Sequence, residues 1–494
     1  MYFACLAPVV AFGQLTGVLT ENALGVPHFL AAAALSGVGY AAFSGQPMTM
    51  IGPTGLTFAY VGALFRLCKF YGWPFASMYA WTGLWCSGFL ALLACGGACR
   101  LVGLVTRFTD DVFNGLIVLT FLATACSNIA LPFAVAGADK TVAFVDASIA
   151  LGTFGLAFVL SKMRSTPYLW RKARNLLSDF GPTLAIGIAT LVARSPAMTK
   201  IASVNGLAVP ASFELGRSLL VPLLPSQGIP AFVPLVALPP AILLTLLFFL
   251  DQNITSRVVN NPMNGLKKGA TYHFDMLVLS VIVAISSLIG LPWMVAATVQ
   301  SLAHVRAMTG TDDDKPAKTG TSAQSVETGA EPLVAGTATS DVAPVIETRL
   351  TGTMVHGLIG CSVLLLPLLR LIPASAISGL FLYLGTRMMA GNAFLARIPL
   401  LFRDYSLEPV GVLKLAPPRT VNIFTLLQVA CLALLWILRA APSTGLLFPS
   451  MILMLVWTRV VLAPRIFSKS DLEVLDEPVM GLDGPKAASA AKSQ

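Results

Sequence analysis

The chain has 494 residues, of which 56% are hydrophobic and only 11% are charged, and its mean hydropathy is +0.79. A soluble protein carries about 25% charged residues, so this chain has too few to cover its apolar surface with a polar coat. The composition also excludes a disordered chain, a coiled coil, collagen and a disulfide-rich secreted scaffold. The sequence therefore predicts a polytopic membrane protein.

The charge balance says less about partners. The formal net charge of +9 is compatible with nucleic-acid binding, but the basic residues stand in short clusters between apolar runs. That pattern is typical of a membrane protein with positively charged cytoplasmic loops, and we expect no nucleic-acid partner. The eight cysteines lie mostly in or beside apolar stretches and lack paired ligand spacing, so they are interpreted as small core residues.

Apolar stretches long enough to cross a bilayer, which takes about 20 residues, recur along the chain. The candidate spans lie near 1–20, 27–43, 75–98, 111–131, 142–160, 180–196, 232–259, 272–290, 351–370, 373–391, 420–440 and 443–463. Two further segments, near 47–68 and 292–308, are interrupted by Gly and Pro and predict half-helices with extended lead-ins. Together these segments predict fourteen spans.

Two polar regions are predicted to lie outside the lipid. Residues 311–349 are rich in acids and small residues and lack aromatic residues, so we expect a disordered linker there, and residues 468–494 form a polar tail. With fourteen spans, the loops after spans 4, 6, 8 and 12 lie on the side of both termini and carry fourteen Lys and Arg residues, against eight in the loops on the opposite side. This excess predicts an integral membrane protein with both termini in the cytoplasm.

The two interrupted segments carry the main functional signal. Gly45-Gln46-Pro47 and Gly290-Leu291-Pro292 stand 245 residues apart, and each is followed by a short extended stretch and a helix start rich in small residues. Paired broken helices in corresponding positions of two halves are typical of transporters with inverted repeats. Their helix N-termini would meet near the bilayer midplane and offer backbone N–H groups to an anion. The alternative is that Gly and Pro are simply common in membrane helices.

A single carboxylate stands inside an apolar span. If a helix begins at Pro240, Asp251 lies eleven residues on, about 16 Å along the axis and near the bilayer centre. A carboxylate there costs about 2.5–3.5 kcal/mol or more unless it faces water or a cation, which indicates a functional group. Thr255 follows one turn later on the same face. The alternative is an acid that only marks the end of a helix.

At these residues the sequence resembles the bicarbonate transporter family, which contains chloride/bicarbonate exchangers, sodium-coupled bicarbonate cotransporters and borate exporters. The matching stretches run in family order across nearly the whole chain, and the GLPW and DQNIT blocks are the most specific. The resemblance covers the transmembrane part, and the large cytoplasmic N-terminal domain of the animal members is not in this sequence. The stretches are SGQPMTMIGPTG, VTRFTDDVFNGLI, LSDFGPT, FFLDQNITSRVV, LKKGATYHFDMLVLSVI, GLPWMVAATVQSLAH, LLPLLRLIPASAISGLFLYLGT and RIFSKSDLEVLD.

The resemblance implies an all-α polytopic fold of about 14 transmembrane segments, arranged as two inverted repeats of seven with two half-helices meeting at the midplane. It also implies a core domain, a gate domain that forms a homodimer contact, and elevator-like movement of one against the other. The boundaries expected are 1–100 and 225–372 for the core (spans 1–4 and 8–11, with the linker 311–349), 101–224 and 373–467 for the gate (spans 5–7 and 12–14), and 468–494 for a cytoplasmic tail.

By the family pattern the site residues fall in three groups. Substrate is expected to contact the two interrupted segments, and Asp251 and Thr255 are expected to hold a cation or to couple it to the substrate. The expected substrate-binding residues are Gly52, Pro53, Thr54, Gly55, Thr298, Val299 and Gln300.

Two positions point to a branch of the family. The exchangers carry a glutamate at the position of Asp251 and an arginine at the position of Gln300, whereas the sodium-coupled and borate branches carry an aspartate at the first position. Without a fixed positive charge at Gln300, sodium held by Asp251 could supply a countercharge. We therefore expect a secondary active transporter of bicarbonate or carbonate in the plasma membrane, with sodium as a possible coupling ion and no other cofactor or metal. A borate exporter and a chloride/bicarbonate exchanger remain as alternatives.

The sequence gives no positive sign of a membrane enzyme. A membrane enzyme needs a convergent cluster of acids, bases or metal ligands, and the four histidines have no second ligand or nucleophile near them in sequence. We therefore expect no catalytic residue and no enzyme activity. A non-transporting membrane scaffold remains open as the alternative of another class.

Overall fold

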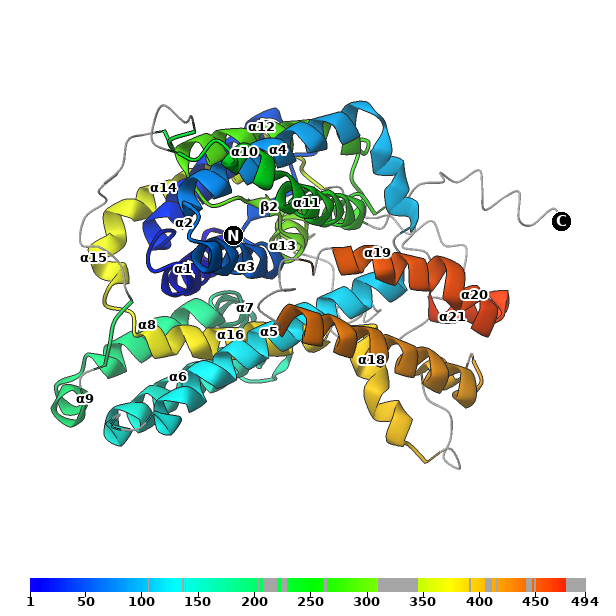
Figure 1. The fold of residues 1–494 in the computed structure, drawn as a ribbon. Coiled ribbons are helices and arrows are strands. Elements are labelled where there is room, and N and C mark those ends of the chain that lie inside the picture. Colours follow the sequence, from blue (N-terminus) through cyan, green and yellow to red (C-terminus); the bar gives the residue numbers. More distant parts are fainter. Residues whose placement is uncertain are drawn as a thin grey trace.

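The computed structural model describes residues 1–476 except 105, 136, 138, 203, 208–219, 224–228, 262–263, 310–344, 391, 405–410, 415, 441–446 and 448–449. The described chain is almost entirely helical, with two short strands (Figure 1). The N-terminal half contains α1 (Tyr2–Leu19), α2 (Val26–Phe43), β1 (Ile51–Gly52), α3 (Gly55–Tyr71), α4 (Phe75–Cys95), α5 (Arg107–Ala134), α6 (Lys140–Lys162), α7 (Arg171–Asp179), α8 (Gly181–Ala193) and α9 (Pro196–Ile201).

The second half also contains long helices and one interrupted segment. It contains α10 (Val233–Val236), α11 (Leu238–Val259), α12 (Tyr272–Ile289), β2 (Val295–Ala296), α13 (Thr298–Met308), α14 (Arg349–Cys361), α15 (Leu366–Leu369), α16 (Ala374–Ala390), α17 (Ala393–Arg397), α18 (Pro418–Ala440), α19 (Ser450–Trp457), α20 (Ala463–Ile466) and α21 (Lys469–Leu475).

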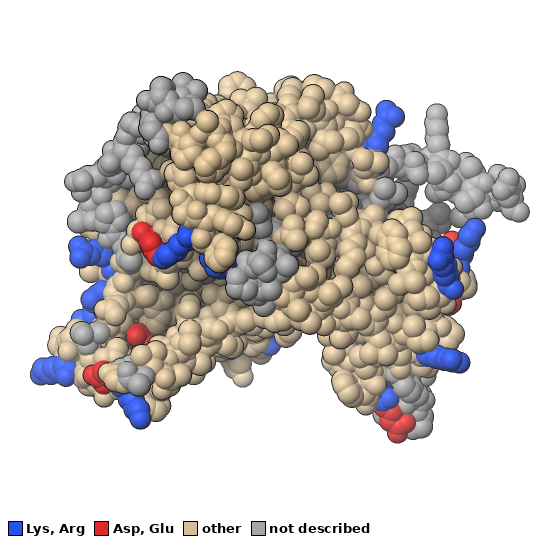
Figure 2. Space-filling view, in the orientation of Figure 1, with Lys and Arg blue, Asp and Glu red and all other residues tan. Residues whose placement is uncertain are grey.

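Nine of the described helices are long and apolar enough to cross a membrane, or ten if the bent pair α7 and α8 is one span. All nine lie where hydropathy predicts a span, with ends that differ by a few residues. Figure 2 agrees with this composition, because charged side chains lie mostly near the margins of the face shown and leave broad uncharged areas between them. The chain has the polytopic all-helical architecture that its composition predicts.

The helices form two groups (Figure 1). In one group α4 packs against α11 and α12, and α14 packs against α2. In the other group α16 packs against α5 and α6, and α6 packs against α8. Apolar side chains join the two groups: the ring of Phe12 on α1 lies 5.7 Å from the rings of both Phe121 on α5 and Phe381 on α16. The interrupted segments with α3 and α13 belong to the first group.

The two polar regions predicted from the sequence are only partly described. Residues 311–344 lie outside the described residues, but 345–349 are ordered, so the predicted disordered linker extends too far at its end. Val345 pairs with Thr309, the Glu347 carboxylate accepts from the backbone N–H of Lys267 and Lys268, and Thr348 caps α14. Sequence composition missed this, because these five residues are held by contacts with distant parts of the chain.

The first residues of the predicted polar tail also pack onto the protein. In α21, Leu472 and Leu475 are buried against the second group of helices. The Asp476 carboxylate accepts from the backbone N–H of Phe108 at the start of α5 and pairs with Arg459. Burial raises the pKa of Asp476, and the bonds with Arg459 and Phe108 act in the opposite direction. Residues 477–494 lie outside the described residues.

Candidate functional site

The two interrupted segments lie side by side. Strands β1 and β2 pair antiparallel, with Ile51 opposite Ala296 and Gly52 opposite Val295. The Ala297 N–H donates to the Met50 carbonyl at 2.9 Å, which extends the pairing to the start of α13. Because α3 begins three residues after β1 and α13 two residues after β2, both helices begin close to the paired strands. The meeting of the two half-helices, inferred from their Gly and Pro breaks, is therefore present in the fold.

At each break, a side chain from another helix forms hydrogen bonds with the backbone of the interrupted segment. At the first break, the Asp275 carboxylate on α12 accepts from the backbone N–H groups of Gly45 at 2.7 Å and Gln46 at 3.3 Å. At the second, the Tyr79 hydroxyl donates to the Leu291 carbonyl at 3.2 Å and accepts from the Trp293 N–H at 3.0 Å. These bonds satisfy backbone groups that a continuous helix would have paired internally.

The N-terminus of α3 carries Gly52, Pro53, Thr54 and Gly55 together. Thr54 is the N-cap, and its Oγ1 accepts from the Thr57 N–H at a long 3.4 Å while it donates to the Asp251 carboxylate at 3.2 Å. A Cβ on Gly55 would approach Ile117 and Phe121 of α5 to 3.2 Å. The absence of a side chain at Gly55 thus lets the helix start lie directly against the second group of helices.

The N-terminus of α13 has a different cap. Its N-cap is Ala297, which has no side-chain oxygen, and the first backbone bond within the helix runs from the Ser301 N–H to the Ala297 carbonyl. The N–H groups of Thr298, Val299 and Gln300 come before that bond, so the helix cannot satisfy them itself. Val299 is 64% exposed, while Thr298 and Gln300 are half-buried. This helix start therefore has backbone donors without an intrahelical partner and the positive end of a dipole.

Asp251 and Thr255 face both half-helices from α11. The Asp251 carboxylate accepts from Thr54 on α3, and the Thr255 hydroxyl lies 2.7 Å from that of Thr298 on α13 and donates to the Ala296 carbonyl at 3.3 Å. None of the ion pairs formed by the described residues includes Asp251. Asp110 on α5 lies near enough to Asp251 for the two carboxyl groups to interact electrostatically. The residues predicted for the site are thus brought to one place.

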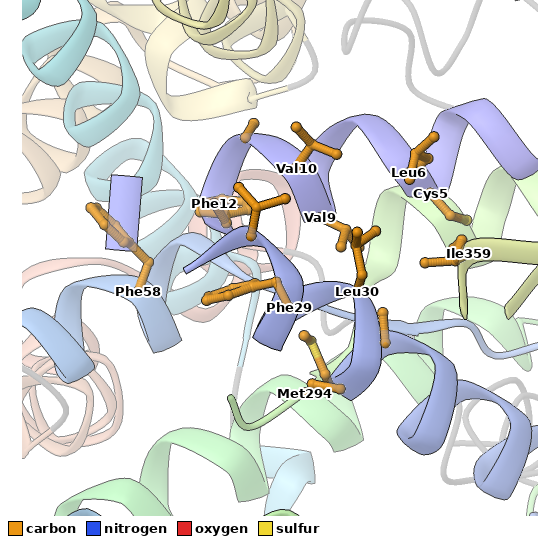
Figure 3. Packing of buried hydrophobic residues seen from close by; sticks show 14 of the residues in the cluster. Cys5, Leu6, Val9, Val10, Phe12, Phe29, Leu30, Phe58, Met294 and Ile359 are labelled. Carbon is orange, nitrogen blue, oxygen red and sulfur yellow. The ribbon is translucent and has the colours of Figure 1, made fainter. Parts of the chain in front are cut away.

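Two small cavities lie beside this junction, and Pro53 lines both. The first is lined on its polar side by Thr16, Thr54 and Thr57. The second is lined by Gly52 and Gln300 from the half-helix regions and by Cys5, His356 and Ile359 from α1 and α14. Figure 3 shows Cys5 and Ile359 close together on their two helices, within the apolar cluster that surrounds this cavity.

Sequence reasoning missed three residues that build the junction. Asp275 looks in sequence like an acid in the first turn of a helix, which is a common place for one. His304 on α13 contacts the Met48 carbonyl through Nδ1, and His356 on α14 contacts the Ile51 carbonyl through Nε2. A signal for each was present, since a titratable residue inside an apolar span indicates function. Their partners are too distant in sequence to be inferred.

Within the described residues, no group of three or more His, Cys, Asp or Glu side chains is placed to hold a metal ion. The Thr54 hydroxyl contacts Asp251, and the Thr255 hydroxyl, one turn along the same face of α11, contacts that of Thr298. Hydroxyl and carboxylate oxygens are ligands for hard cations.

Comparison with known proteins decides the family. Residues 1–136 and 134–480 match the model of the HCO3⁻ transporter integral membrane domain. This chain belongs to the bicarbonate transporter family. The match spans nearly the whole chain and confirms the resemblance recognised from the DQNIT and GLPW blocks. The family consists of membrane transporters, and the chain is an integral membrane protein by its family and its apolar helices.

Relatives within the family are several. The chain is 30% identical over 550 aligned positions to the electroneutral sodium bicarbonate exchanger 1 of Rattus norvegicus, covering 97% of this chain and 48% of the relative. It is 29% identical to the sodium-driven chloride bicarbonate exchanger of Homo sapiens, covering 100% and 48%. It is 30% identical to anion exchange protein 3 of Oryctolagus cuniculus, covering 98% and 41%. The chain thus spans about half the length of the curated relatives that it matches.

Solved structures share its fold. The transmembrane domain of the cyanobacterium bicarbonate transporter BicA superimposes with a TM-score of 0.58 over 87% of this chain and 94% of that one, at 14% identity. The murine anion transporter Slc26a9 in its inward-facing state gives 0.55 over 93% and 67%, at 10% identity. These likenesses establish a polytopic helical membrane fold for this family member.

Proposed function

We propose that this chain is a secondary active transporter of inorganic anions that carries bicarbonate or carbonate, with sodium as the coupling ion. The observation that carries the proposal is the junction itself. Pairing of β1 with β2 sets the starts of α3 and α13 beside each other, and Asp251 contacts the first of them. In this proposal the anion and the cation bind at separate places within one site.

The anion end of the proposal rests on the start of α13. Its first N–H groups, at Thr298, Val299 and Gln300, have no side-chain cap because Ala297 precedes them. Backbone N–H groups and the helix dipole favour a small anion such as bicarbonate. Gly52 and Pro53 on the facing segment present little side-chain bulk, so in this proposal the oxygens of the anion approach both helix starts.

The cation end rests on Asp251. Its carboxylate accepts a bond from Thr54 and experiences the charge of Asp110, so a bound cation would relieve the repulsion between the two carboxylates. Thr255 lies one turn along α11 from Asp251, and its hydroxyl contacts that of Thr298. Sodium at Asp251 would also neutralise part of the charge of the anion, which links binding of the two ions.

The architecture proposed for transport has fourteen spans in two inverted repeats of seven. Besides the nine long apolar helices, α3, α8, α13, α16 and α19 lie at the five remaining positions where the sequence predicts a span. The two groups of helices agree with a core at 1–100 and 225–372 and a gate at 101–224 and 373–467. In this proposal the core moves against the gate in an elevator-like manner, and two chains associate through the gate as a homodimer in the plasma membrane, with both termini cytoplasmic.

Chloride exchange is the second candidate function. It is supported by the names of two relatives, a sodium-driven chloride bicarbonate exchanger and an anion exchange protein. Borate export and a non-transporting scaffold are further outcomes that the experiment below separates.

The test is purified full chain in liposomes that contain a pH-sensitive dye. Gradients of bicarbonate, borate or chloride are applied with and without sodium, and internal pH is followed. Sodium-dependent bicarbonate movement supports the proposal. Bicarbonate movement that depends on chloride and not on sodium would identify a chloride exchanger. Borate movement would identify a borate exporter, and no movement of any anion would support a non-transporting scaffold.

The matched variants are Asp251→Asn and Asp179→Asn. Asp179 is an exposed aspartate paired with Arg164, so its variant controls for a charge change that leaves the site intact. We expect Asp251→Asn to lose sodium dependence and at least about tenfold in rate, as for removal of a charged partner. If Asp251→Asn moved bicarbonate at the wild-type rate, Asp251 would not belong to the site.

A further inference from the structure

His356 lies in the second cavity, between α14 and the segment that precedes α3. Its side chain is only 2% exposed. The cavity that it lines is shared with Gly52, Pro53 and Gln300, three residues of the proposed anion site. No step of the proposed function uses this histidine.

Both ring nitrogens of His356 face carbonyl oxygens. Nδ1 lies 2.8 Å from the Gly352 carbonyl oxygen, and Nε2 lies 2.9 Å from the Ile51 carbonyl oxygen. A carbonyl oxygen only accepts hydrogen bonds, and a neutral imidazole has one N–H. In the neutral ring one nitrogen lone pair would therefore face an oxygen lone pair, whereas the imidazolium donates to both oxygens.

The position of the ring is fixed by its surroundings. A Cβ on Gly37 of α2 would overlap the imidazole ring, so only glycine leaves room for it there. The ring therefore packs directly against the backbone of α2, which limits its movement away from the two carbonyl groups. This makes the two contacts a property of the fold rather than of one rotamer.

A second buried histidine provides an internal comparison. His304 Nδ1 lies 3.1 Å from the Met48 carbonyl oxygen, but its Nε2 lies 2.6 Å from the Thr351 hydroxyl. A hydroxyl can donate as well as accept, so neutral His304 satisfies both of its contacts. Of these two buried histidines, His356 alone gains a hydrogen bond by taking a second proton.

The elements around His356 offer no carboxylate to balance that proton. Helices α1, α2, α13 and α14 and strand β1 are described throughout, and none contains Asp or Glu. Their titratable and charged side chains are Tyr2, Cys5, His28, Tyr40, His304, Arg306, Arg349 and Cys361. An imidazolium at His356 therefore needs a negative charge from outside these elements, and the anion site shares its cavity.

We infer that His356 binds a proton together with the transported anion, so that its imidazolium is a countercharge of the bound anion and anion binding is coupled to proton uptake. The inference rests on the proposed function, because the anion is the one transported. The proton comes from water on the side to which the site is open and returns to water when the anion leaves. Since coupling is reciprocal, the anion raises the proton affinity of His356 by the same factor by which the proton raises the anion affinity.

The experiment is a pH titration of full chain labelled with ¹⁵N in its histidine rings and held in lipid nanodiscs, in fixed bicarbonate or in gluconate. The four histidines give few signals, and His356→Gln assigns the one of interest. We expect that signal to convert to the charged form, at a pH that bicarbonate raises by about one unit, a tenfold change in proton affinity. The matched control His304→Gln keeps this shift. If His356→Gln does not fold, variants of His28, His273 and His304 assign the signal by elimination.

Two outcomes of the titration would overturn the inference. One is a His356 ring that stays in a single neutral form throughout the range from about pH 5 to pH 9 in both solutions. The other is a titration with the same midpoint in bicarbonate and gluconate. Liposome flux separates these from failure of the proposed function: wild-type chain that moves no anion at any pH contradicts transport itself, whereas pH-insensitive bicarbonate flux contradicts only the role of His356.

Discussion

The two interrupted segments have the same outline but are built by different chemistry. The first break is held by a buried carboxylate, Asp275, and its helix is capped by Thr54. The second break begins where Gly290 ends α12 in a left-handed conformation, and it is held by the hydroxyl of Tyr79, whose ring stacks on Trp293 at 3.7 Å. Its helix begins at Ala297 without a side-chain cap. The start of α3 thus has a side-chain cap on one of its first N–H groups, whereas the start of α13 has none.

The largest effect is expected from Asp275→Ala. The carboxylate is fully buried and accepts from Gly45, Gln46 and Thr271, so its removal leaves buried donors without an acceptor. We expect the free energy of unfolding in nanodiscs to fall by about 3 kcal/mol. Asp275→Asn keeps one acceptor oxygen and should lose less. An unchanged unfolding curve for Asp275→Ala would show that the first break does not depend on this residue.

Ala297→Asp tests whether the uncapped helix holds the anion. An aspartate at the N-cap would place its own carboxylate on the N–H groups of α13, where it would repel and displace a bound anion. We expect bicarbonate flux in liposomes to fall at least about tenfold, the effect of a single charge at a binding site. Ala297→Asn has the same size without the charge and should retain more flux. Equal flux in the two variants would contradict anion binding at this helix.

Tyr79→Phe probes the second break. It removes the hydroxyl that bridges the Leu291 carbonyl and the Trp293 N–H but keeps the stacked ring. We expect a loss of about 1–2 kcal/mol in the free energy of unfolding, less than for Asp275→Ala because neutral bonds are weaker than bonds to a charge. Tyr71→Phe is the control, since Tyr71 is exposed. A loss equal in both variants would mean that the bridge contributes nothing.

The smallest effect is expected from Thr54→Ala. Its bonds to the Thr57 N–H and to Asp251 are long, 3.4 and 3.2 Å, so their loss should lower stability by only about 0.5–1 kcal/mol. The sodium concentration for half-maximal flux should rise several-fold, because Asp251 loses a partner that fixes its position. Thr54→Ser should restore both properties. If the sodium dependence of Thr54→Ala were unaltered, the Thr54 hydroxyl would have no role in the cation site.

Hydropathy predicted the helices well because a helix that crosses lipid must be long and apolar. Most of the ends found for α2, α11 and α12 lie within two residues of the predicted ends. The breaks were visible because Gly and Pro interrupt that pattern. Asp251 was recognisable as the single acid within its apolar helix. By contrast, the pairing of β1 with β2 joins strands of two residues, which carry no periodic signal.

Residues whose role depends on distant partners were beyond sequence reasoning. The Asp275 carboxylate accepts from a backbone N–H 230 residues away in sequence, and His356 contacts a carbonyl 305 residues away. Their place inside an apolar span is a local signal, but nothing local identifies the partner of either residue. The end of the linker was missed for the same reason, since Val345 is ordered by its pairing with Thr309.

The account depends most on the anion lying at the start of α13, and a distance measurement tests this directly. Full chain in lipid, labelled with ¹⁵N at the backbone of glutamine, is incubated with ¹³C-bicarbonate, and the coupling between the two nuclei is measured by solid-state NMR. The account predicts a ¹³C–¹⁵N separation of about 4 Å, as for an amide that donates to a bicarbonate oxygen, and its disappearance in Gln300→Asn. Bound bicarbonate without that coupling, or with the same coupling in Gln300→Asn, would contradict it.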